Sequence, residues 1–263
     1  MELTDRQVEI LSTINRLGRV DVEVLASEYA VTTQTIRRDL NELCIRGLAA
    51  RIHGGAMPVI SVSNVDYQAR RQLAATEKEH IAQIVAALIP NQCSIILNIG
   101  TTIEQVARAL YEHTGLVVIT NNIHVISTLT GSPQKDLVLV GGTVRQSDGA
   151  IVGEDAVEFI SRYKADFACI GASAIDEDGA ILDFDAREVS VARAILKNAR
   201  TKILVCDSLK FERTAPVRIC DIGDVDYFVT DSDPPEAFRH VAELRGTQIV
   251  TLDDHRLSDV SSL

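Results

Sequence analysis

A short segment near the amino terminus combines hydrogen-bonding and cationic side chains at helical spacing. It reads Thr33-Gln-Thr-Ile-Arg-Arg-Asp-Leu40. If Thr32 caps a helix here, Ile36, Leu40 and Leu43 recur on one face. The outward face then carries Thr33, Gln34, Thr35, Arg37 and Arg38. Short polar groups beside two arginines are suited to contacts with nucleic-acid base edges and phosphates.

Charge is unevenly distributed along the chain. The net charge of −11 would by itself argue against a nucleic-acid partner. However, residues 1–57 carry seven Arg and eight Asp or Glu, so nearly all of the negative excess lies after them. Between Thr33 and His53, four arginines are accompanied only by Asp39 and Glu42. The alternative is an ordinary solvated helix face, on which Arg37, Asp39 and Glu42 simply carry charge.

The residues before this segment predict two more helices. Thr4 and Gln7 have the spacing of a capping box, and the apolar periodicity after them predicts a helix that ends at Gly18. Asp21 is placed to cap a short second helix, and a tight turn then leads into the polar segment. This order of elements is the layout of a helix-turn-helix.

The segment that follows the third helix predicts a β wing. Gly47 breaks the helical pattern, and residues 48–56 form two short extended runs around a turn. On such a wing, Arg51 and His53 are placed to offer a charge or a donor to the DNA backbone or minor groove. A plain linker hairpin is the alternative.

The rest of the chain alternates between apolar strands and helices. A first helix is predicted from the capping-box pair Thr76 and Glu79 to Pro90. Strands are predicted at 93–99, 116–120, 137–140, 166–171, 202–206 and 227–230, and helices at 103–110, 123–129, 156–163 and 187–199. Continuous apolar strands separated by helices imply a largely parallel sheet covered on both faces, an open α/β sandwich.

Small and polar residues follow four of these predicted strands, at the sheet edge where ligands bind in such folds. They are Asn98-Ile-Gly-Thr-Thr102, Thr120-Asn-Asn122, Gly141-Gly-Thr-Val-Arg145 and Gly171-Ala-Ser173. Gly100 lets the backbone approach an anion, and Thr101 and Thr102 add hydroxyls at a helix start, which favours phosphate. Taken alone, Gly-Thr-Thr is also ordinary turn and cap chemistry.

Arg145 has two competing interpretations. Its guanidinium is suited to bidentate pairing with a phosphate. It is equally suited to a structural ion pair with Asp148 or Glu154, and the sequence does not choose between the two.

A further cluster of charged residues supplies carboxylates and one lysine. Asp183 and Glu188 suit ligand hydroxyls, and Lys210 suits a phosphate or a carboxylate. The competing view is that Asp185 caps a helix while Glu188 pairs with Arg193 on its surface. Both views can hold in part.

Two motifs together resemble the DeoR-type transcriptional regulators: Thr33-Gln-Thr-Ile-Arg-Arg-Asp-Leu-Asn-Glu-Leu43 and Arg51-Ile-His-Gly-Gly-Ala56. The resemblance implies an N-terminal winged helix-turn-helix that binds double-stranded operator DNA. It also implies a C-terminal α/β open sheet domain, resembling ribose-5-phosphate isomerase in fold, that senses a phosphorylated sugar or polyol. The expected domains are a DNA-binding domain at 1–57, a linker at 58–75, an effector domain at 76–252 and a polar tail at 253–263.

The resemblance also implies which residues contact the effector. The lining is expected to include Gly100, Thr101, Thr102, Asn121, Gly141, Arg145, Glu188 and Lys210, to which the strand-end pattern adds Asn98, Gly142 and Asp183. Within the family, further motifs favour glycerol 3-phosphate as effector: Thr76-Glu-Lys-Glu79, Ser147-Asp-Gly149, Asp183-Phe-Asp185 and Pro234-Pro235. Two departures from the family pattern, Asn98 for a usual Asp and Leu209 for a usual Ser, remove a charge and a hydroxyl near the proposed phosphate.

The expected function is therefore repression by a homodimer or homotetramer that presents two winged helices to an inverted-repeat operator. The effector would favour an arrangement of the two helices that cannot fit both half-sites. Two alternatives stay open. One is a sugar-phosphate isomerase-like enzyme, with Asp183 or Glu188 as general base and Lys210 holding the charged intermediate. The other is a transcriptional activator with the same architecture.

Several classes of protein are not expected. No apolar stretch approaches the roughly 20 residues that span a bilayer, and the amino terminus lacks a signal pattern, so a cytoplasmic protein is expected. The five cysteines are scattered with no CxxC pair, which argues against a disulfide framework and a zinc site. No cofactor, metal or catalytic residue is predicted.

Overall fold

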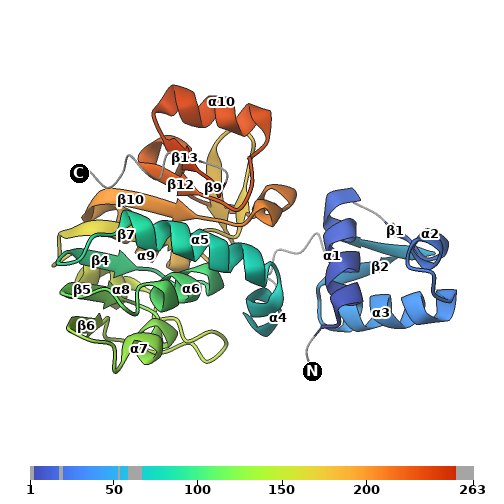
Figure 1. The fold of residues 1–263 in the computed structure, drawn as a ribbon, viewed down its shortest axis with the longest axis horizontal. Coiled ribbons are helices and arrows are strands. Elements are labelled where there is room, and N and C mark those ends of the chain that lie inside the picture. The colour runs from blue at the N-terminus through green and yellow to red at the C-terminus, as the bar shows by residue number, and fades with distance from the viewer. Residues whose placement is uncertain (1–2, 18–19, 53, 59–66, 253–263) are drawn as a thin grey trace. The chain divides into compact units, whose positions relative to one another are not determined.

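The computed structural model of the protein describes residues 3–17, 20–52, 54–58 and 67–252. The chain divides into two compact units, Met1–Ala74 and Ala75–Leu263, which are called here the N-terminal and C-terminal units (Figure 1). Within the described ranges, no helix is long and apolar enough to cross a membrane.

Helices and a small antiparallel sheet form the N-terminal unit. Its elements are α1 (Asp5–Leu17), β1 (Val20–Asp21), α2 (Val22–Glu28), α3 (Thr33–Ile45), β2 (Ala49–Ile52), β3 (Gly55–Pro58) and α4 (Tyr67–Gln72). The predicted helix-turn-helix and wing are confirmed. β1 was not predicted, and it pairs with β3 to give the strand order β1-β3-β2. The hairpin is therefore part of a packed sheet rather than a plain linker.

The predicted caps explain where the first three helices begin. The Thr4 backbone N–H donates to Gln7 Oε1 (3.0 Å), and the Gln7 N–H donates to Thr4 Oγ1 (3.3 Å), which completes a capping box. Asp21 and Thr32 accept from first-turn amides of α2 and α3 at 2.8 and 3.2 Å. The helices enclose one core, whose fully buried members include Ile10, Ile14, Leu25, Ile36, Leu40 and Leu43.

Gly55 allows β3 to approach β1 closely. A Cβ atom at this position would lie 1.9 Å from the carbonyl oxygen of Val20. We expect Gly55→Ala to lower the free energy of unfolding by about 1–3 kcal/mol, because the two strands must separate. Urea unfolding followed by circular dichroism measures this. Gly141→Ala is the control, since nothing lies within 4 Å of a Cβ there. Equal stability of the two variants would contradict the expectation.

Seven strands form the central sheet of the C-terminal unit. They are β4 (Ser94–Leu97), β5 (Leu116–Thr120), β6 (Lys135–Leu139), β7 (Ala165–Gly171), β10 (Ala199–Val205), β12 (Tyr227–Val229) and β13 (Gln248–Val250). All neighbours run parallel, in the order β13-β12-β10-β7-β4-β5-β6 (Figure 1). The helices are α5 (Ala75–Leu88), α6 (Thr101–Ala109), α7 (Ile123–Leu129), α8 (Glu154–Ile160), α9 (Ala186–Lys197) and α10 (Glu236–Arg245). The predicted parallel α/β sheet is confirmed.

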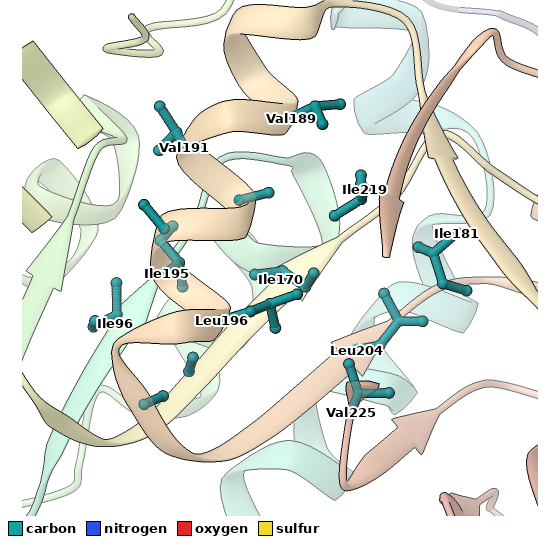
Figure 2. Close-up of a cluster of buried hydrophobic side chains, with 14 of the residues drawn as sticks. Ile96, Ile170, Ile181, Val189, Val191, Ile195, Leu196, Leu204, Ile219 and Val225 are labelled. Atoms are coloured by element: carbon teal, nitrogen blue, oxygen red, sulfur yellow. The ribbon is translucent and has the colours of Figure 1, made fainter. Parts of the chain in front are cut away.

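Helices cover both faces of this sheet because alternate residues of each strand point to opposite sides. In β4, Ile95 and Leu97 pack with apolar residues of α5, α6 and α7, whereas Ile96 packs with those of α8 and α9. Figure 2 shows part of the cluster that contains Ile96, with Leu196 of α9 beside Ile170 of β7. β4, whose carboxyl end carries part of the predicted site, is therefore held by apolar packing on both of its faces.

Several elements of the C-terminal unit were not predicted. A three-stranded antiparallel sheet of order β11-β9-β8 consists of β8 (Ala174–Ile175), β9 (Ala180–Asp183) and β11 (Val217–Asp221). Two 3-10 helices, η1 (Ser208–Glu212) and η2 (Ile222–Asp224), as well as β13 and α10, were also missed. The predicted cap at Thr76 is wrong, because α5 begins at Ala75 and Thr76 lies within its first turn.

β4 lies inside the sheet between β7 and β5, so the polar residues that follow these three strands lie at neighbouring positions on one edge. From β4 the chain moves outward through β5 and β6, then returns to place β7 on the other side of β4. The Asn98 N–H donates to the Cys169 carbonyl (3.1 Å) at this boundary. Such a reversal of strand order opens a crevice beyond the carboxyl ends of the strands, which is where open α/β sheets bind ligands.

Candidate functional site

The outward face of α3 carries the predicted polar side chains. Gln34, Arg37 and Arg38 are exposed, Thr33 and Thr35 are partly exposed, and Ile36, Leu40 and Leu43 on the opposite face are fully buried. All five predicted polar residues are therefore at least partly exposed on α3. Within the described part of the chain, neither arginine forms an ion pair.

Two acids of α3 turn away from this face. Asp39 is only 5% exposed, so its interpretation as part of a solvated face is wrong. Its carboxylate accepts from Arg6 Nε (2.7 Å) and from Gln7 Nε2 (3.3 Å), and Gln7 Nε2 also donates to Glu42 (3.0 Å). Because these carboxylates are paired inside the unit, the cationic character of the outer face is not cancelled locally.

The wing contributes one further described cation. Arg51 is exposed on β2, at the position paired with Ala56 of β3. The predicted His53 lies outside the described residues. A three-helix unit with a charged wing beside its third helix is suited to reading a duplex, with α3 in the major groove and the wing along the backbone.

Buried amide side chains mark the carboxyl ends of β4 and β5 in the C-terminal unit. Asn98 is 4% exposed and Asn121 is 0% exposed. Among the described residues, the Oδ1 atoms of both lack a hydrogen-bond partner, as does Nδ2 of Asn122. A buried polar group without a partner costs about 1–3 kcal/mol. Such groups in a native structure indicate that a polar ligand or ordered water completes the site.

The loop after β4 has the backbone geometry of an anion site. Gly100 adopts φ +129°, a conformation that favours glycine, and stands before α6 without a side-chain cap. Thr101 and Thr102, which follow it, are both buried. The positive end of a nine-residue helix therefore coincides with the two predicted hydroxyls.

The loop after β6 folds back toward the end of β5. Gly141 and Gly142 are exposed there. The Arg145 N–H donates to the Ala150 carbonyl (2.8 Å), and Asn121 Nδ2 donates to the Ile151 carbonyl (3.0 Å). Residues 150–151, at the end of this loop, thus connect Asn121 after β5 to Arg145 after β6.

Arg145 is surrounded by three carboxylates. Its Nε donates to Asp148 (2.8 Å) and Nη1 donates to Asp185 (3.3 Å), while Nη2 pairs with both Asp148 and Glu188. This cluster joins the loop after β6 to the first turn of α9. Within the described residues, these bonds use four of the five guanidinium N–H groups, so a phosphate could accept a single bond from Nη1, whereas bidentate pairing would require a carboxylate to leave.

The structure shows which partners Arg145, Asp185 and Glu188 have, where the sequence left alternatives open. Of the two acids considered as partners of Arg145, Asp148 is the one that bonds it. Asp185 does cap α9, accepting from a first-turn amide at 2.9 Å. The surface pair of Glu188 with Arg193 is wrong, because Glu188 contacts Arg145 and Arg193 donates to backbone carbonyls of β11.

Asp183, Glu188 and Lys210 lie on neighbouring elements. Burial and the charge of Asp183 raise the pKa of Glu188 to about 7, although the nearby Arg145 acts to lower it. Asp183 accepts from Ser173 Oγ (2.9 Å), which links it to the end of β7. Burial raises the pKa of the Cys206 thiol to about 12, and the charges of Lys210 and Asp183 both act on it. Lys210 and Asp183 therefore both lie near Cys206, the residue that follows β10.

Other candidate sites in the described ranges are few. No group of three or more His, Cys, Asp or Glu there is arranged to hold a metal, and all five cysteines are free thiols. A cavity of about 320 Å³ between α5 and α6 is lined by none of the predicted effector residues. Asn122, Asp148 and Asp185 were not assigned to the site from sequence, although all three lie in or beside the motifs that were.

Two family models match the chain. Residues 6–61 match the DeoR-like helix-turn-helix domain, and residues 73–232 match the DeoR C terminal sensor domain. Together they cover 216 of the 263 residues.

Curated relatives match over almost their whole length. The glycerol-3-phosphate regulon repressor of Haemophilus influenzae is 42% identical over 250 residues, covering 95% of this chain and 97% of that protein. The Escherichia coli K12 protein of the same name is 42% identical over 241 residues, covering 92% and 96%. The HTH-type transcriptional repressor CsqR of Escherichia coli K12 is 36% identical over 244 residues, covering 93% of each chain.

Among solved structures, ribose 5-phosphate isomerase A from Methanocaldococcus jannaschii matches at 16% identity with a TM-score of 0.39. The match covers 52% of this chain and 55% of that one.

Proposed function

The chain belongs to the DeoR family of transcriptional regulators, and we propose that it represses transcription by binding operator DNA and releases it when a phosphorylated metabolite binds the C-terminal unit. The outward face of α3 is the observation that carries this proposal, since Arg37 and Arg38 are exposed there while the acids of the same helix are paired inside. The curated relatives named as repressors support the direction of regulation.

The DNA-reading surface in this proposal consists of α3 and the wing. Base edges and phosphates are contacted by Thr33, Gln34, Thr35, Arg37, Arg38, Arg51 and His53. One such unit reads only a few base pairs, so the proposal includes a homodimer or homotetramer that engages two half-sites. The effector must bind the DNA-incompetent arrangement more tightly by at least about 1–3 kcal/mol to give a useful response.

The proposed effector is glycerol 3-phosphate, which the names of the relatives at 42% identity favour. Its phosphate would lie at the start of α6, against Gly100, Thr101 and Thr102. Its hydroxyls would donate to the unpartnered oxygens of Asn98 and Asn121. The remaining proposed contacts are Gly141, Gly142, Arg145, Asp183, Glu188 and Lys210, and Arg145 would pair with the phosphate in a bidentate way only if a carboxylate leaves it.

Thermal denaturation with a panel of phosphorylated metabolites, followed by gel shift with any hit, tests the whole proposal. Glycerol 3-phosphate is expected to raise the melting temperature and to release operator DNA. An operator complex that persists with every phosphoester at saturation would contradict the repressor mechanism. Failure of the protein to bind its own promoter at low ionic strength would contradict DNA recognition itself.

Thr101→Val tests effector binding separately from operator binding. The substitution keeps the shape of the side chain but removes the hydroxyl beside the proposed phosphate, so we expect effector affinity to fall about 5- to 150-fold, the equivalent of roughly 1–3 kcal/mol. Operator binding without effector should stay unchanged. Calorimetric titration measures the affinity, and Thr130→Val, at an exposed site after α7, is the matched control.

A second candidate function is isomerase-like catalysis, because Glu188 beside Asp183 has a pKa suited to a general base. We propose that the chain is not an enzyme, since the matched relatives are named as repressors. Incubation with sugar phosphates should yield no isomer. Turnover that is lost in Glu188→Gln would establish the enzyme instead.

A further inference from the structure

Asp39 is a buried acid on a helix whose other charged side chains lie at or near the surface. α3 buries Ile36, Leu40 and Leu43, and Asp39 at 5% exposure lies among them. Removing a carboxylate from water is costly, and an apolar side chain of similar volume often stabilises a protein equally well. Stability alone therefore does not account for an ion pair at this position.

Hydrogen bonds from Arg6 and Gln7 of α1 reach α3 at two positions along its axis, Asp39 and Glu42. Arg6 Nε donates to one oxygen of Asp39 (2.7 Å) and Gln7 Nε2 donates to the other (3.3 Å). Gln7 Nε2 also donates to Glu42 (3.0 Å), nearly one turn further along α3. The Gln7 side chain is itself held, since its Oε1 accepts from the Thr4 N–H (3.0 Å) in the capping box of α1.

Two directional contacts almost one turn apart restrain a helix differently from apolar packing. Leucine and isoleucine contacts are nondirectional and tolerate small rotations and shifts. Hydrogen bonds from one fixed side chain to Asp39 and Glu42 define both the rotation of α3 about its axis and its position along that axis. Gln7 is 3% exposed, so water does not compete readily for these bonds.

The restrained rotation sets which way the two arginines point. Successive helix residues are rotated by about 100°, so an inward Asp39 fixes Arg38 to one side and Arg37 nearly opposite. Both are exposed in the structure. Arg6 also neutralises Asp39 inside the unit, which keeps that negative charge from opposing a phosphate at the outer face.

We propose that Gln7 and Asp39 are positioning residues for operator recognition, which orient α3 so that its outward side chains meet the correct base edges. The inference rests on the proposed DNA-binding function and deepens it. Neither residue touches DNA in this proposal. Their loss should therefore reduce discrimination between sequences more than it reduces attraction to phosphates.

The test compares operator and scrambled duplex binding across a salt series, using the full-length protein. For Gln7→Met and Asp39→Asn we expect the ratio of operator to scrambled affinity to fall at least tenfold. The slope of log affinity against log salt on scrambled DNA should stay unchanged, because no phosphate contact is removed. Glu28→Gln, which removes one exposed acid from the same unit, is the control.

A folded variant is required for each conclusion, so circular dichroism accompanies each measurement. If the single variants unfold, Arg6→Met with Asp39→Leu replaces this ion pair by apolar side chains, and the same tenfold loss of discrimination is expected. Discrimination equal to the parent in a folded variant would overturn the inference. If the parent itself does not prefer its operator, the proposed function fails instead, so the two failures are distinguishable.

Discussion

Replacing Arg37 and Arg38 together by alanine is expected to weaken operator binding by roughly 30- to 1,000-fold, because each lost arginine removes a contact worth about 1–2 kcal/mol. Both side chains are exposed on α3, and neither is engaged in an ion pair within the described ranges, so DNA need not displace a competing acid. The dependence of operator affinity on salt concentration shows whether each arginine contacts a phosphate or a base. Each arginine that contacts phosphate lowers the slope of log affinity against log salt by about one unit.

Fluorescence anisotropy with a labelled operator measures both quantities. Arg162→Ala, at an exposed position in the C-terminal unit, is a control for the loss of positive charge. Stabilisation by the effector should be retained in the double variant, since the proposed effector site lies in the other unit. Operator affinity within a factor of two of the parent would show that α3 does not read DNA through these arginines.

Glu188→Gln is expected to remove a pH dependence of stability on the order of 3 kcal/mol. Burial, together with the charge of Asp183, raises the pKa of Glu188 from 4.5 to about 7. The folded state therefore holds a proton that the unfolded chain releases. The stability contributed in this way is fully present below pH 4.5 and is lost as pH rises through about 7. Glutamine cannot titrate, so its contribution is constant.

Urea unfolding at pH 5, 6, 7 and 8 measures this difference. Other groups also titrate, so the informative quantity is the difference between variant and parent at each pH. Glu158→Gln is the control, because the side chain of Glu158 is 73% exposed and pairs only with Arg162 in the described ranges. A pH profile of Glu188→Gln parallel to that of the parent would show that Glu188 is not the titrating group.

The fold was predictable where apolar periodicity was long and uninterrupted. The strand predicted at 116–120 and the helix at 123–129 have the same bounds in the structure. By contrast, β8 has only two residues, which is too short to show an alternating pattern. β9 and β11 pair across more than thirty residues, and antiparallel pairing at that separation leaves no local signal.

The sequence indicated which strand ends form the candidate site, but it indicated the partner of a charged residue only when that partner is close in sequence. The pair of Arg145 with Asp148, three residues away, was one of the alternatives considered. The pairs of Arg145 with Asp185 and Glu188 depend on how the loop after β6 meets α9, about forty residues away, which the sequence does not show. Asp39 shows the same limit. Helical periodicity gives its angle relative to Ile36 and Leu40, but the partners that stabilise an inward carboxylate, Arg6 and Gln7, lie on another helix.

The interior place of β4 has a consequence for the order in which a new chain folds during synthesis. The N-terminal unit ends at Ala74, whereas Ser94 of β4 bonds Asp166, 72 residues later, at the start of β7. Closing so long a loop is slow, and domains generally fold as units as they leave the ribosome. The N-terminal unit, which is proposed to bind DNA, is therefore complete while most of the C-terminal sheet is still being translated. It can fold before the unit that is proposed to bind the effector exists.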